Sequence, residues 1–356
     1  MASYEKRNNK WTVRFRVDGQ NKRLSGYDTK KDAEQAYIKA KATSKKSTDN
    51  LTILQLFELY KNYKQPRIKE SSFCSIIQSL QDYVLPYFEK MKISNLKATD
   101  IANWQNEINS KSIKYATKNR IHRTFVNFVN FAVDFYNLPF NPVSKVGNFK
   151  NNELKPQMDF WTEQEFTQFI SVVDDLTHKA FFSTLYLTGA RKGEIMALTW
   201  QDINFDTSII NITKTYTNKV VGGGYKITPP KTKSSNRQIL MTASLTNLLK
   251  NLHTEQQTYV GYTPKCFVFG FSRPLALISI DRNKTKYCNL AGVKQIRIHD
   301  FRHSHASLLL NKGQNILLVA QRLGHSDINQ TLNTYSHLFP NRQKEIIDSI
   351  DIIVDN

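Results

Sequence analysis

The stretch Leu323-Gly-His-Ser-Asp-Ile-Asn-Gln-Thr-Leu-Asn-Thr-Tyr-Ser-His-Leu338 decides how this chain is interpreted. It places Tyr335 ten residues after His325. Two other motifs precede it, Gly189-Ala-Arg191-Lys-Gly-Glu194 and His299-Asp-Phe-Arg302. Each motif alone is common, and the chain holds 16 tyrosines. Their order and spacing along one chain are hard to obtain by accident, so the motifs are interpreted together.

Local sequence signals place these residues on helices and at helix ends. Gly189 is suited to end a helix, and Arg191 then lies just before the next one. His299 and Arg302 are three residues apart and share one face of a helix. Asn315 is suited to begin the following helix, which is expected to end at Gly324 and to present His325 from its last turn. Tyr335 is expected on a further helix.

The residue types suit metal-free cleavage of a DNA phosphodiester. Arginines offer paired donors to the phosphate oxygens, histidines move protons and bind oxygen, and a phenolate can attack phosphorus. The combination resembles the tyrosine recombinase family, which includes phage and transposon integrases. The resemblance implies six catalytic residues: Arg191, Lys231, His299, Arg302, His325 and Tyr335.

The resemblance also implies a role for each residue. Tyr335 would form a 3′-phosphotyrosyl link, and Arg191 and Arg302 would bind the non-bridging oxygens with His325 as a third donor. His299 would accept or relay the tyrosine proton. Lys231, in Pro229-Pro-Lys-Thr-Lys-Ser-Ser-Asn-Arg237, would protonate the leaving oxygen, with Lys233 as the alternative.

Three features near these motifs are interpreted differently. Glu194 matches an acidic position that supports the arginines in the family, although it can equally cap a helix start. His303 and His305 are interpreted as coincidental neighbours of the motif. The interval of ten residues between His325 and Tyr335 is one more than in many relatives. It leaves open whether Tyr335 serves its own subunit or a neighbour.

The charge pattern favours a long polyanionic partner. The 356-residue chain has a net charge of +20. Basic residues outnumber acidic ones by 13 to 6 in residues 1–50, by 14 to 7 in 51–150 and by 23 to 17 in 151–356. The excess is therefore spread along the chain, which suits a nucleic acid passing every domain. The longest apolar run, of five residues, is far short of the ~20 of a membrane helix.

The first 46 residues predict a small sheet backed by one helix. Residues 11–17 alternate between apolar and polar, Asp18-Gly19 signals a hairpin, and Gln20–Leu24 returns. Thr29 and Asp32 resemble a helix-capping pair. The basic residues of the hairpin are proposed to read DNA in a major groove, as in the arm-binding domain of such integrases: Arg14, Arg16, Lys22 and Arg23. A small domain with a solvated polar face remains the alternative.

Residues 51–145 predict an all-helical domain that resembles the core-binding domain of the family. Four helices are expected, over Leu51–Tyr63, Ser71–Val84, Thr99–Asn109 and Tyr115–Tyr136. The series Phe125, Phe128, Phe131, Phe135 has helical spacing and is interpreted as core. Linkers are expected at Ala42–Asn50 and Lys145–Gln157. The predicted DNA-binding residues here are Lys114, Lys118, Arg120 and Arg123.

Residues 155–356 predict a mainly helical α+β catalytic domain. Helices are expected after Thr162 and up to Thr188, and short strands over Ser208–Thr213, Tyr225–Thr228 and Gln238–Met241. The isoleucines of residues 340–356 can dock on a neighbouring protomer or complete this subunit's own core. The chain as a whole is therefore predicted to be multidomain, with a sheet-and-helix arm domain, an all-α domain and this catalytic domain.

The resemblance implies a function and partners. The expected activity is site-specific integration and excision of a mobile element such as a phage, by a homotetramer on double-stranded core and arm attachment sites. An excisionase and a host DNA-bending protein are expected partners. Neither cofactor nor metal is expected, and three widely spaced cysteines favour a reducing cytoplasm. The alternatives are a type IB topoisomerase-like enzyme, a chromosome dimer-resolving recombinase and a catalytically idle DNA-binding regulator.

Overall fold

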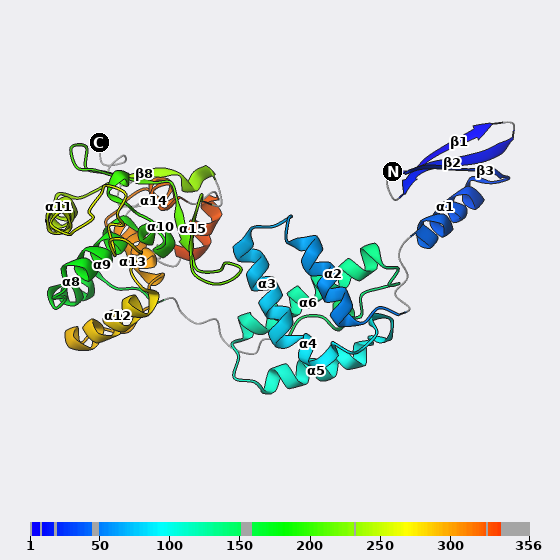
Figure 1. The fold of residues 1–356 in the computed structure, drawn as a ribbon, viewed down its shortest axis with the longest axis horizontal. Coiled ribbons are helices and arrows are strands. Elements are labelled where there is room, and N and C mark those ends of the chain that lie inside the picture. The colour runs from blue at the N-terminus through cyan, green and yellow to red at the C-terminus, as the bar shows by residue number, and fades with distance from the viewer. Residues whose placement is uncertain are drawn as a thin grey trace, which may run out of the picture. The chain divides into compact units, whose positions relative to one another are not determined.

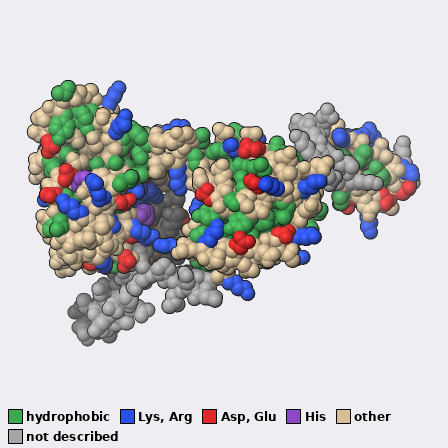
Figure 2. Space-filling model, turned by 60° about the horizontal axis from the view of Figure 1, so that its bottom comes forward, with side chains coloured by type: hydrophobic (Ala, Val, Ile, Leu, Met, Phe, Trp, Pro, Cys, Tyr) green, Lys and Arg blue, Asp and Glu red, His purple; other side chains and the backbone are tan. Residues whose placement is uncertain are grey.

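A computed structural model describes residues 2–7, 9–17, 20–44, 50–150, 159–230, 233–324 and 327–335. The chain divides into two compact units. One contains Met1–Leu154 with Lys219–Gly222, and the other contains Lys155–Asn218 with Gly223–Asn356. Figure 1 shows the elements of both units, and Figure 2 shows Lys and Arg side chains on the surface of each part of the chain.

The N-terminal region is a three-stranded antiparallel sheet followed by one helix (Figure 1). The expected hairpin is confirmed, and an additional strand precedes it. Thr29 and Asp32 exchange the expected capping contacts, with the Asp32 amide donating to Thr29 Oγ1 at 3.1 Å. The elements are β1 (Ser3–Arg7), β2 (Lys10–Val17), β3 (Gln20–Tyr27) and α1 (Lys30–Ser44).

The strand register separates the basic residues of the hairpin. Arg14 pairs with Arg23, whereas Lys22 pairs with Phe15. Directly paired residues lie on the same face of a sheet. Phe15 is buried and packs on Tyr37 of α1 with ring centroids 4.9 Å apart. Lys22 therefore belongs to the opposite face from Arg14 and Arg23, so the basic residues of the hairpin do not all share one face.

One linker begins later than the sequence suggested. Helix α1 continues to Ser44, so residues 42–44 are helical. A helix that already has one buried face extends at little cost through Ala, Thr and Ser. The remainder of that expected linker, residues 45–49, lies outside the described residues.

Helices dominate residues 50–150, as expected. The four predicted helices are confirmed within a few residues at each end. Two short helices and one 3-10 helix are present in addition, and the sequence did not predict them. The elements are α2 (Ile53–Lys64), α3 (Glu70–Tyr83), α4 (Leu85–Phe88), η1 (Ile93–Asn95), α5 (Ala98–Ser110), α6 (Tyr115–Phe135) and α7 (Pro142–Val146).

The core of this helical region contains three of the four predicted phenylalanines. Phe125, Phe128 and Phe131 are buried, whereas Phe135 at the end of α6 is 44% exposed. The core also extends beyond its expected end. Phe149 is buried, its carbonyl accepts from Tyr115 at 2.8 Å, and α7 precedes it. A linker beginning at residue 145 is therefore wrong, because residues 145–149 contribute to packing.

The second unit is mainly helical with two small sheets. Its sheets have the orders β4-β5-β8 and β6-β7, all antiparallel. Its helices are α8 (Glu163–Ser171), α9 (Leu176–Thr188), α10 (Lys192–Met196), α11 (Ala243–Gln257), α12 (Leu277–Ala291), α13 (Asp300–Asn311), α14 (Ile316–Leu323) and α15 (Ile328–Tyr335). Its strands and 3-10 helices are η2 (Trp200–Asp202), β4 (Ile203–Asn204), β5 (Ile209–Ile212), β6 (Thr215–Thr217), β7 (Lys226–Thr228), η3 (Lys233–Ser235) and β8 (Arg237–Leu240).

Helix α9 lies at the centre of this unit and packs against α8, α11 and α13. Most of its residues are buried, and the Phe182 and Phe301 rings stack 5.7 Å apart between α9 and α13. The predicted capping box of Thr162 and Glu165 begins α8. Because α9 and α13 each carry part of the motif set, their packing fixes the candidate site.

Membrane helices, cysteines and metal-binding groups can be checked in the described residues. None of the described helices is long and apolar enough to cross a membrane. Cys74, Cys266 and Cys288 carry free thiols. Within the described ranges, no group of three or more His, Cys, Asp or Glu side chains is placed to hold a metal ion.

Candidate active site

Arg191 lies at a tight junction between two helices. Helix α9 ends at Gly189, whose φ of 65° lies in the left-handed region, and Arg191 is the N-cap of α10. A Cβ atom at Gly189 would lie 2.5 Å from Cδ2 of His305. Glycine is therefore required by both its backbone conformation and its close approach to α13.

Glu194 holds two arginines with one carboxylate. Arg191 donates from its backbone amide to Oε2 and from Nη1 to Oε1, both at 2.9 Å. Arg237 of β8 donates from Nη2 to Oε2, also at 2.9 Å. Burial opposes the charged form, but the hydrogen bond and charge of Arg237, with Arg191, hold the Glu194 pKa below its usual value. Glu194 thus both caps α10 and supports the arginines, so the two sequence interpretations hold together.

Arg302 is a buried cation with an open donor. It is 4% exposed, and Nη1 donates to the Gly189 carbonyl at 2.9 Å. Among the described residues, its Nη2 has no hydrogen-bond partner. Burial, followed by repulsion from Arg191 and Arg237, lowers the Arg302 pKa to about 9. A buried donor on a cation near two other arginines forms a site suited to an anion.

Two histidines lie at the start of α13, and one of them contacts Tyr335. His299 is the N-cap of α13, and burial and Arg302 lower its pKa. Its ring meets that of His303 edge-on, with centroids 5.2 Å apart. Nδ1 of His303 lies 2.6 Å from the Tyr335 hydroxyl. His303 was interpreted as coincidental from the sequence, and its position one helical turn after His299 was the available signal.

Tyr335 is held inside its own subunit. It is 2% exposed and packs among Ala306, Leu310, Val319 and Leu323 of α13 and α14. Burial raises the pKa of its phenol well above the usual value. In the DNA-free protein the phenol is therefore neutral.

His305 and Arg322 fasten α14 beneath the site. Arg322 Nε donates to His305 Nε2 at 3.2 Å, and Arg322 Nη2 donates to the carbonyls of Leu187 and Leu240 at 3.1 and 3.2 Å. Burial, followed by repulsion from Arg322, lowers the His305 pKa to about 3, which matches a neutral acceptor. These bonds tie the end of α14 to α9 and β8. They also fix Gly324, the residue before His325.

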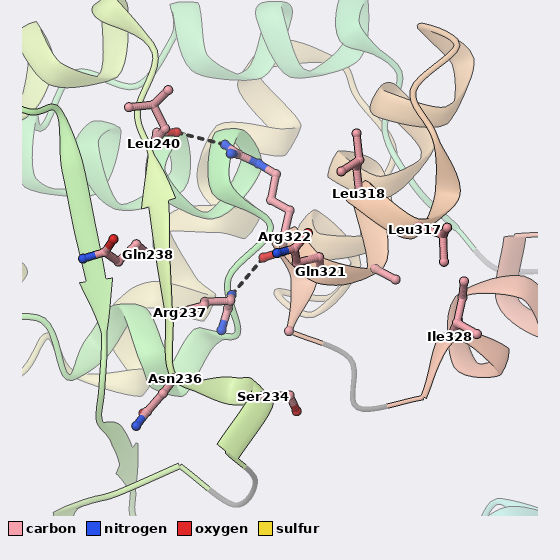
Figure 3. A pocket seen from close by; sticks show the side chains of 12 residues that line it. Ser234, Asn236, Arg237, Gln238, Leu240, Leu317, Leu318, Gln321, Arg322 and Ile328 are labelled. Atoms are coloured by element: carbon pink, nitrogen blue, oxygen red, sulfur yellow. Dashed lines mark hydrogen bonds between the residues drawn. The ribbon is translucent and has the colours of Figure 1, made fainter.

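A pocket of about 1000 Å³ adjoins this end of α14. Arg237, Arg322 and Leu240 line it, and Figure 3 shows the bonds that join them. Arg237 Nε donates to the Arg322 carbonyl at 2.8 Å, and Arg322 Nη2 donates to the Leu240 carbonyl at 3.2 Å. Leu317 and Leu318, each 59% exposed, contribute to its lining. The segment 340–356, whose isoleucines can dock on a neighbouring protomer or complete this subunit's own core, lies outside the described residues.

Four of the six predicted catalytic residues fall in the described part of the chain. Arg302 and Arg191 repel each other, Arg191 also lowers the pKa of His299, and Arg302 interacts with Tyr335, so these four groups share one electrostatic site. Lys231 and His325 lie outside the described residues, and Lys233 begins η3 with its side chain likewise outside them. Sequence reasoning missed the contributions of Arg237 and His303.

The predicted DNA-binding residues are placed less uniformly. Arg14 and Arg23 are direct cross-strand partners, and Arg14 Nη2 lies 3.3 Å from Glu5 Oε2. The side chain of Arg16 lies outside the described part, and Lys22 belongs to the other face of the sheet.

The four basic residues of α6 also differ from one another. Lys114 is the N-cap of α6, and Lys118 bonds back to the Asn109 carbonyl at 3.0 Å. Arg120 and Arg123 are exposed and three residues apart on one helical face.

Comparison with known proteins agrees with this geometry. The sequence pattern described as the phage integrase family matches residues 159–342, and that of the phage integrase N-terminal SAM-like domain matches residues 52–109. The chain belongs to the phage integrase family. It is therefore a tyrosine recombinase, an enzyme that cleaves and rejoins DNA in site-specific recombination.

Similar sequences carry the names of integrases and transposases. The recombinase is 30% identical to the ICEBs1 integrase of Bacillus subtilis over 280 residues, which are 76% of this chain and 75% of that one. It is 23% identical to the Tn916 transposase of Enterococcus faecalis, over 81% of this chain and 74% of that one.

The Tn1549 transposon integrase, solved in complex with transposon right end DNA, shares the fold with a TM-score of 0.67. It is 21% identical and covers 85% of this chain and 100% of that one.

Proposed function

We propose that this recombinase integrates and excises a mobile element through a 3′-phosphotyrosine formed on Tyr335. The observation that carries the proposal is the buried guanidinium of Arg302, whose Nη2 is open among the described residues. Arg191 and Tyr335 both lie within electrostatic reach of it. An anionic phosphodiester between the two arginines satisfies this donor and offsets their mutual repulsion.

The two arginines stabilise the negative charge of the pentacoordinate transition state at phosphorus. Arg302 and Arg191 donate to the non-bridging oxygens, and the planar guanidinium makes parallel bonds that a lysine cannot. Arg191, Arg237 and Arg302 together form an arginine cradle. Glu194 orients Arg191 while also pairing with Arg237, so its single negative charge does not cancel the positive charge of this cradle. This electrostatic stabilisation takes the place of the metal ions that other phosphoryl-transfer enzymes use.

The remaining assignments concern proton transfer and oxygen binding. His325 supplies a third donor to the phosphate. His299 lies beside Arg302, where it binds a phosphate oxygen or relays the tyrosine proton. Lys231 protonates the 5′-oxygen that leaves, with Lys233 as the alternative. The phosphotyrosine conserves the energy of the broken diester, so a 5′-hydroxyl of a second duplex rejoins the strand without ATP.

The three domains divide the DNA between them. Residues 1–46 read arm sites through the face that carries Arg14 and Arg23, with Arg16 in the same strand. Residues 51–145 hold the core site, with Arg120 and Arg123 exposed on α6 and Lys114 at its start. Residues 155–356 perform the chemistry. Two DNA-binding regions on one chain suit the bridging of distant sites.

The active assembly on DNA is a homotetramer that holds two duplexes in the cytoplasm, close to the nucleoid. An excisionase and a host DNA-bending protein bias it toward excision or integration. A topoisomerase-like enzyme acts on one duplex and has no need of the N-terminal sheet. The same sheet distinguishes this chain from the usual chromosome dimer-resolving recombinase, so the integrase is the better supported function.

Replacing one oxygen atom tests the proposal. Tyr335→Phe removes only the phenolic oxygen, so we expect nearly intact DNA binding and complete loss of the covalent protein–DNA complex. The substrate is a nicked duplex taken from the junction between the element and its flanking chromosome. Denaturing gels measure the complex, and a covalent band that persists in the variant would assign the nucleophile to another residue.

A further inference from the structure

The Tyr335 hydroxyl has one well-defined neighbour. Nδ1 of His303 lies 2.6 Å from it, and His303 is the hydrogen-bond partner that the described residues offer this oxygen. The tyrosine ring is fixed by Ala306, Leu310 and the end of α14. The contact joins the end of α15 to α13 within one subunit. His303 directly follows Arg302, so the contact lies in the same helical turn of α13 as one arginine of the cradle.

We propose that His303 takes the proton from Tyr335 when the phenol attacks the scissile phosphate. The proposal rests on the proposed function, in which Tyr335 is the nucleophile. The phenolic oxygen forms a bond to phosphorus while the bond between phosphorus and the 5′-oxygen breaks. The phenolic proton moves to Nδ1 of His303, Nε2 keeps its own proton, and the leaving oxygen is protonated by the separate acid. Rejoining reverses each transfer.

Geometry assigns the proton to His303 rather than to His299. The two histidines are one turn apart on the same face of α13. The ring of His299 meets that of His303 with centroids 5.2 Å apart, whereas His303 contacts the phenol itself. A general base has to lie within hydrogen-bond reach of the proton that it removes. His303 satisfies that condition before DNA arrives.

The charges around His303 suit a base that acts only on bound DNA. His299, Asp300, Arg297 and Arg302 face it, together with Tyr335. Burial, followed by repulsion from His299, lowers the His303 pKa to about 4 even though Asp300 opposes this shift. The ring is therefore neutral at pH 7, and Nδ1 can accept the phenolic hydrogen.

The same environment keeps the Tyr335 phenol protonated in the DNA-free enzyme. Burial holds the Tyr335 pKa above its usual value, so a base as weak as His303 does not ionise the phenol in the absence of substrate. A phosphate in the cradle offsets the charge of Arg302 and raises the basicity of His303. The substrate thus creates the conditions for its own cleavage.

The contact itself is tested in the DNA-free protein by a double-mutant cycle. Tyr335→Phe and His303→Leu are combined, and thermal unfolding is measured for the full chain and its variants. We expect the two Tm changes to be non-additive by about 2–4 °C, the shift that a single buried hydrogen bond produces in a domain of this size. The matched pair Tyr335→Phe with His299→Leu is expected to be additive. Additivity in both cycles contradicts the proposal.

The proton transfer is tested by the pH dependence of single-turnover cleavage. The substrate is the nicked junction duplex used for Tyr335. In His303→Asn the amide oxygen replaces Nδ1 as an acceptor but cannot take a proton, so we expect cleavage about 10²–10⁴-fold slower at pH 7. Its rate should rise about tenfold per pH unit from pH 7 to 10 as the phenol ionises unaided. The parent rate should level off, because a neutral His303 is present throughout.

Controls separate this proposal from its neighbours. His299→Asn is expected to be slower than the parent but to keep the level profile. A sulfur leaving atom is expected not to rescue His303→Asn, because the lost proton transfer is on the nucleophile's side.

Two results of the cleavage experiment also overturn the proposal. In one, His303→Asn cleaves at the parent rate, which makes the contact structural. In the other, the rising profile belongs to His299→Asn. If the parent forms no covalent complex through Tyr335, the proposed function fails instead.

Discussion

Two neighbouring parts of the catalytic unit solve opposite electrostatic problems. The arginine cradle is charged and rigid, since Glu194 binds Arg191 and Arg237 at 2.9 Å each. The tyrosine pocket is apolar and neutral, since burial raises the pKa of Tyr335 and lowers that of His303. Both parts meet on α13, where Arg302 and His303 are adjacent. The difference indicates that positive charge is arranged in the DNA-free protein, whereas the Tyr335 phenol is kept neutral there.

The strongest test of the cradle preserves its charge and removes its shape. Arg302→Lys or Arg191→Lys should slow cleavage of the nicked junction duplex by about 10²–10³-fold, because a lysine cannot offer two parallel donors. Arg282→Lys, on the exposed surface of α12, should leave the rate close to that of the parent. Single-turnover rates of a cradle variant within about tenfold of the parent, roughly 1.4 kcal/mol, would mean that shape is not what the cradle supplies.

A second test separates the leaving-group side from both regions. Lys231→Ala should cleave ordinary DNA about 10²-fold more slowly and recover when the leaving oxygen is replaced by sulfur, since a thiolate leaves without a proton. Arg191 and Arg302 variants should not recover. Rescue of Lys233→Ala in place of Lys231→Ala would reassign the acid, and rescue of neither would remove it from this segment.

A third test concerns the stability that the cradle contributes. Glu194→Gln leaves the buried Arg237 without its full counter-charge, so we expect a loss of about 3 kcal/mol in the free energy of unfolding near pH 7. The pKa of Glu194 is lowered in the folded state, so its contribution is present above the unfolded pKa and is lost as the pH falls through the folded pKa. Urea unfolding of the parent and the variant across pH measures the stability loss and its pH dependence. A difference in unfolding free energy that persists unchanged into acid would contradict the role given to the Glu194 charge.

The smallest expected effect on chemistry comes from the region furthest from the site in sequence. Deleting residues 1–46 should leave nicking of core sites close to the parent rate while abolishing integration, because the arm reader is lost and both cradle and pocket remain. Footprinting of the full chain should reveal protected sites away from the exchange point. Protection of core sites alone would show that the N-terminal sheet does not read arms.

Sequence reasoning succeeded where local signals decide structure. The helix ends at Gly189, Asn315 and Gly324 were predicted from capping preferences that act within a few residues. The order of Arg191, Arg302 and Tyr335 along the chain predicted one common site, and the structure brings their charges within reach of one another. The half-buried strand of the N-terminal hairpin followed from alternation, with Val13 and Phe15 buried as expected.

The failures concern contacts between distant segments. Arg237 contacts Glu194 across 43 positions, and His303 meets Tyr335 across 32, which no local pattern reveals. The sequence did not reveal that Lys22 and Arg23 belong to opposite faces of the sheet, because the pairing register decides which residues share a face. Phe149 was placed in a linker because a single aromatic residue has no periodicity to mark it as core.

Glu194 makes the movements of distant elements inseparable. Arg237 begins β8 directly after the segment of Lys231, and it bonds both to Glu194 and to the carbonyl of Arg322 at the end of α14. We therefore expect any displacement of β8 to move Arg191 and the end of α14 as well. One side chain of β8 thus couples Arg191, through Glu194, to the end of α14.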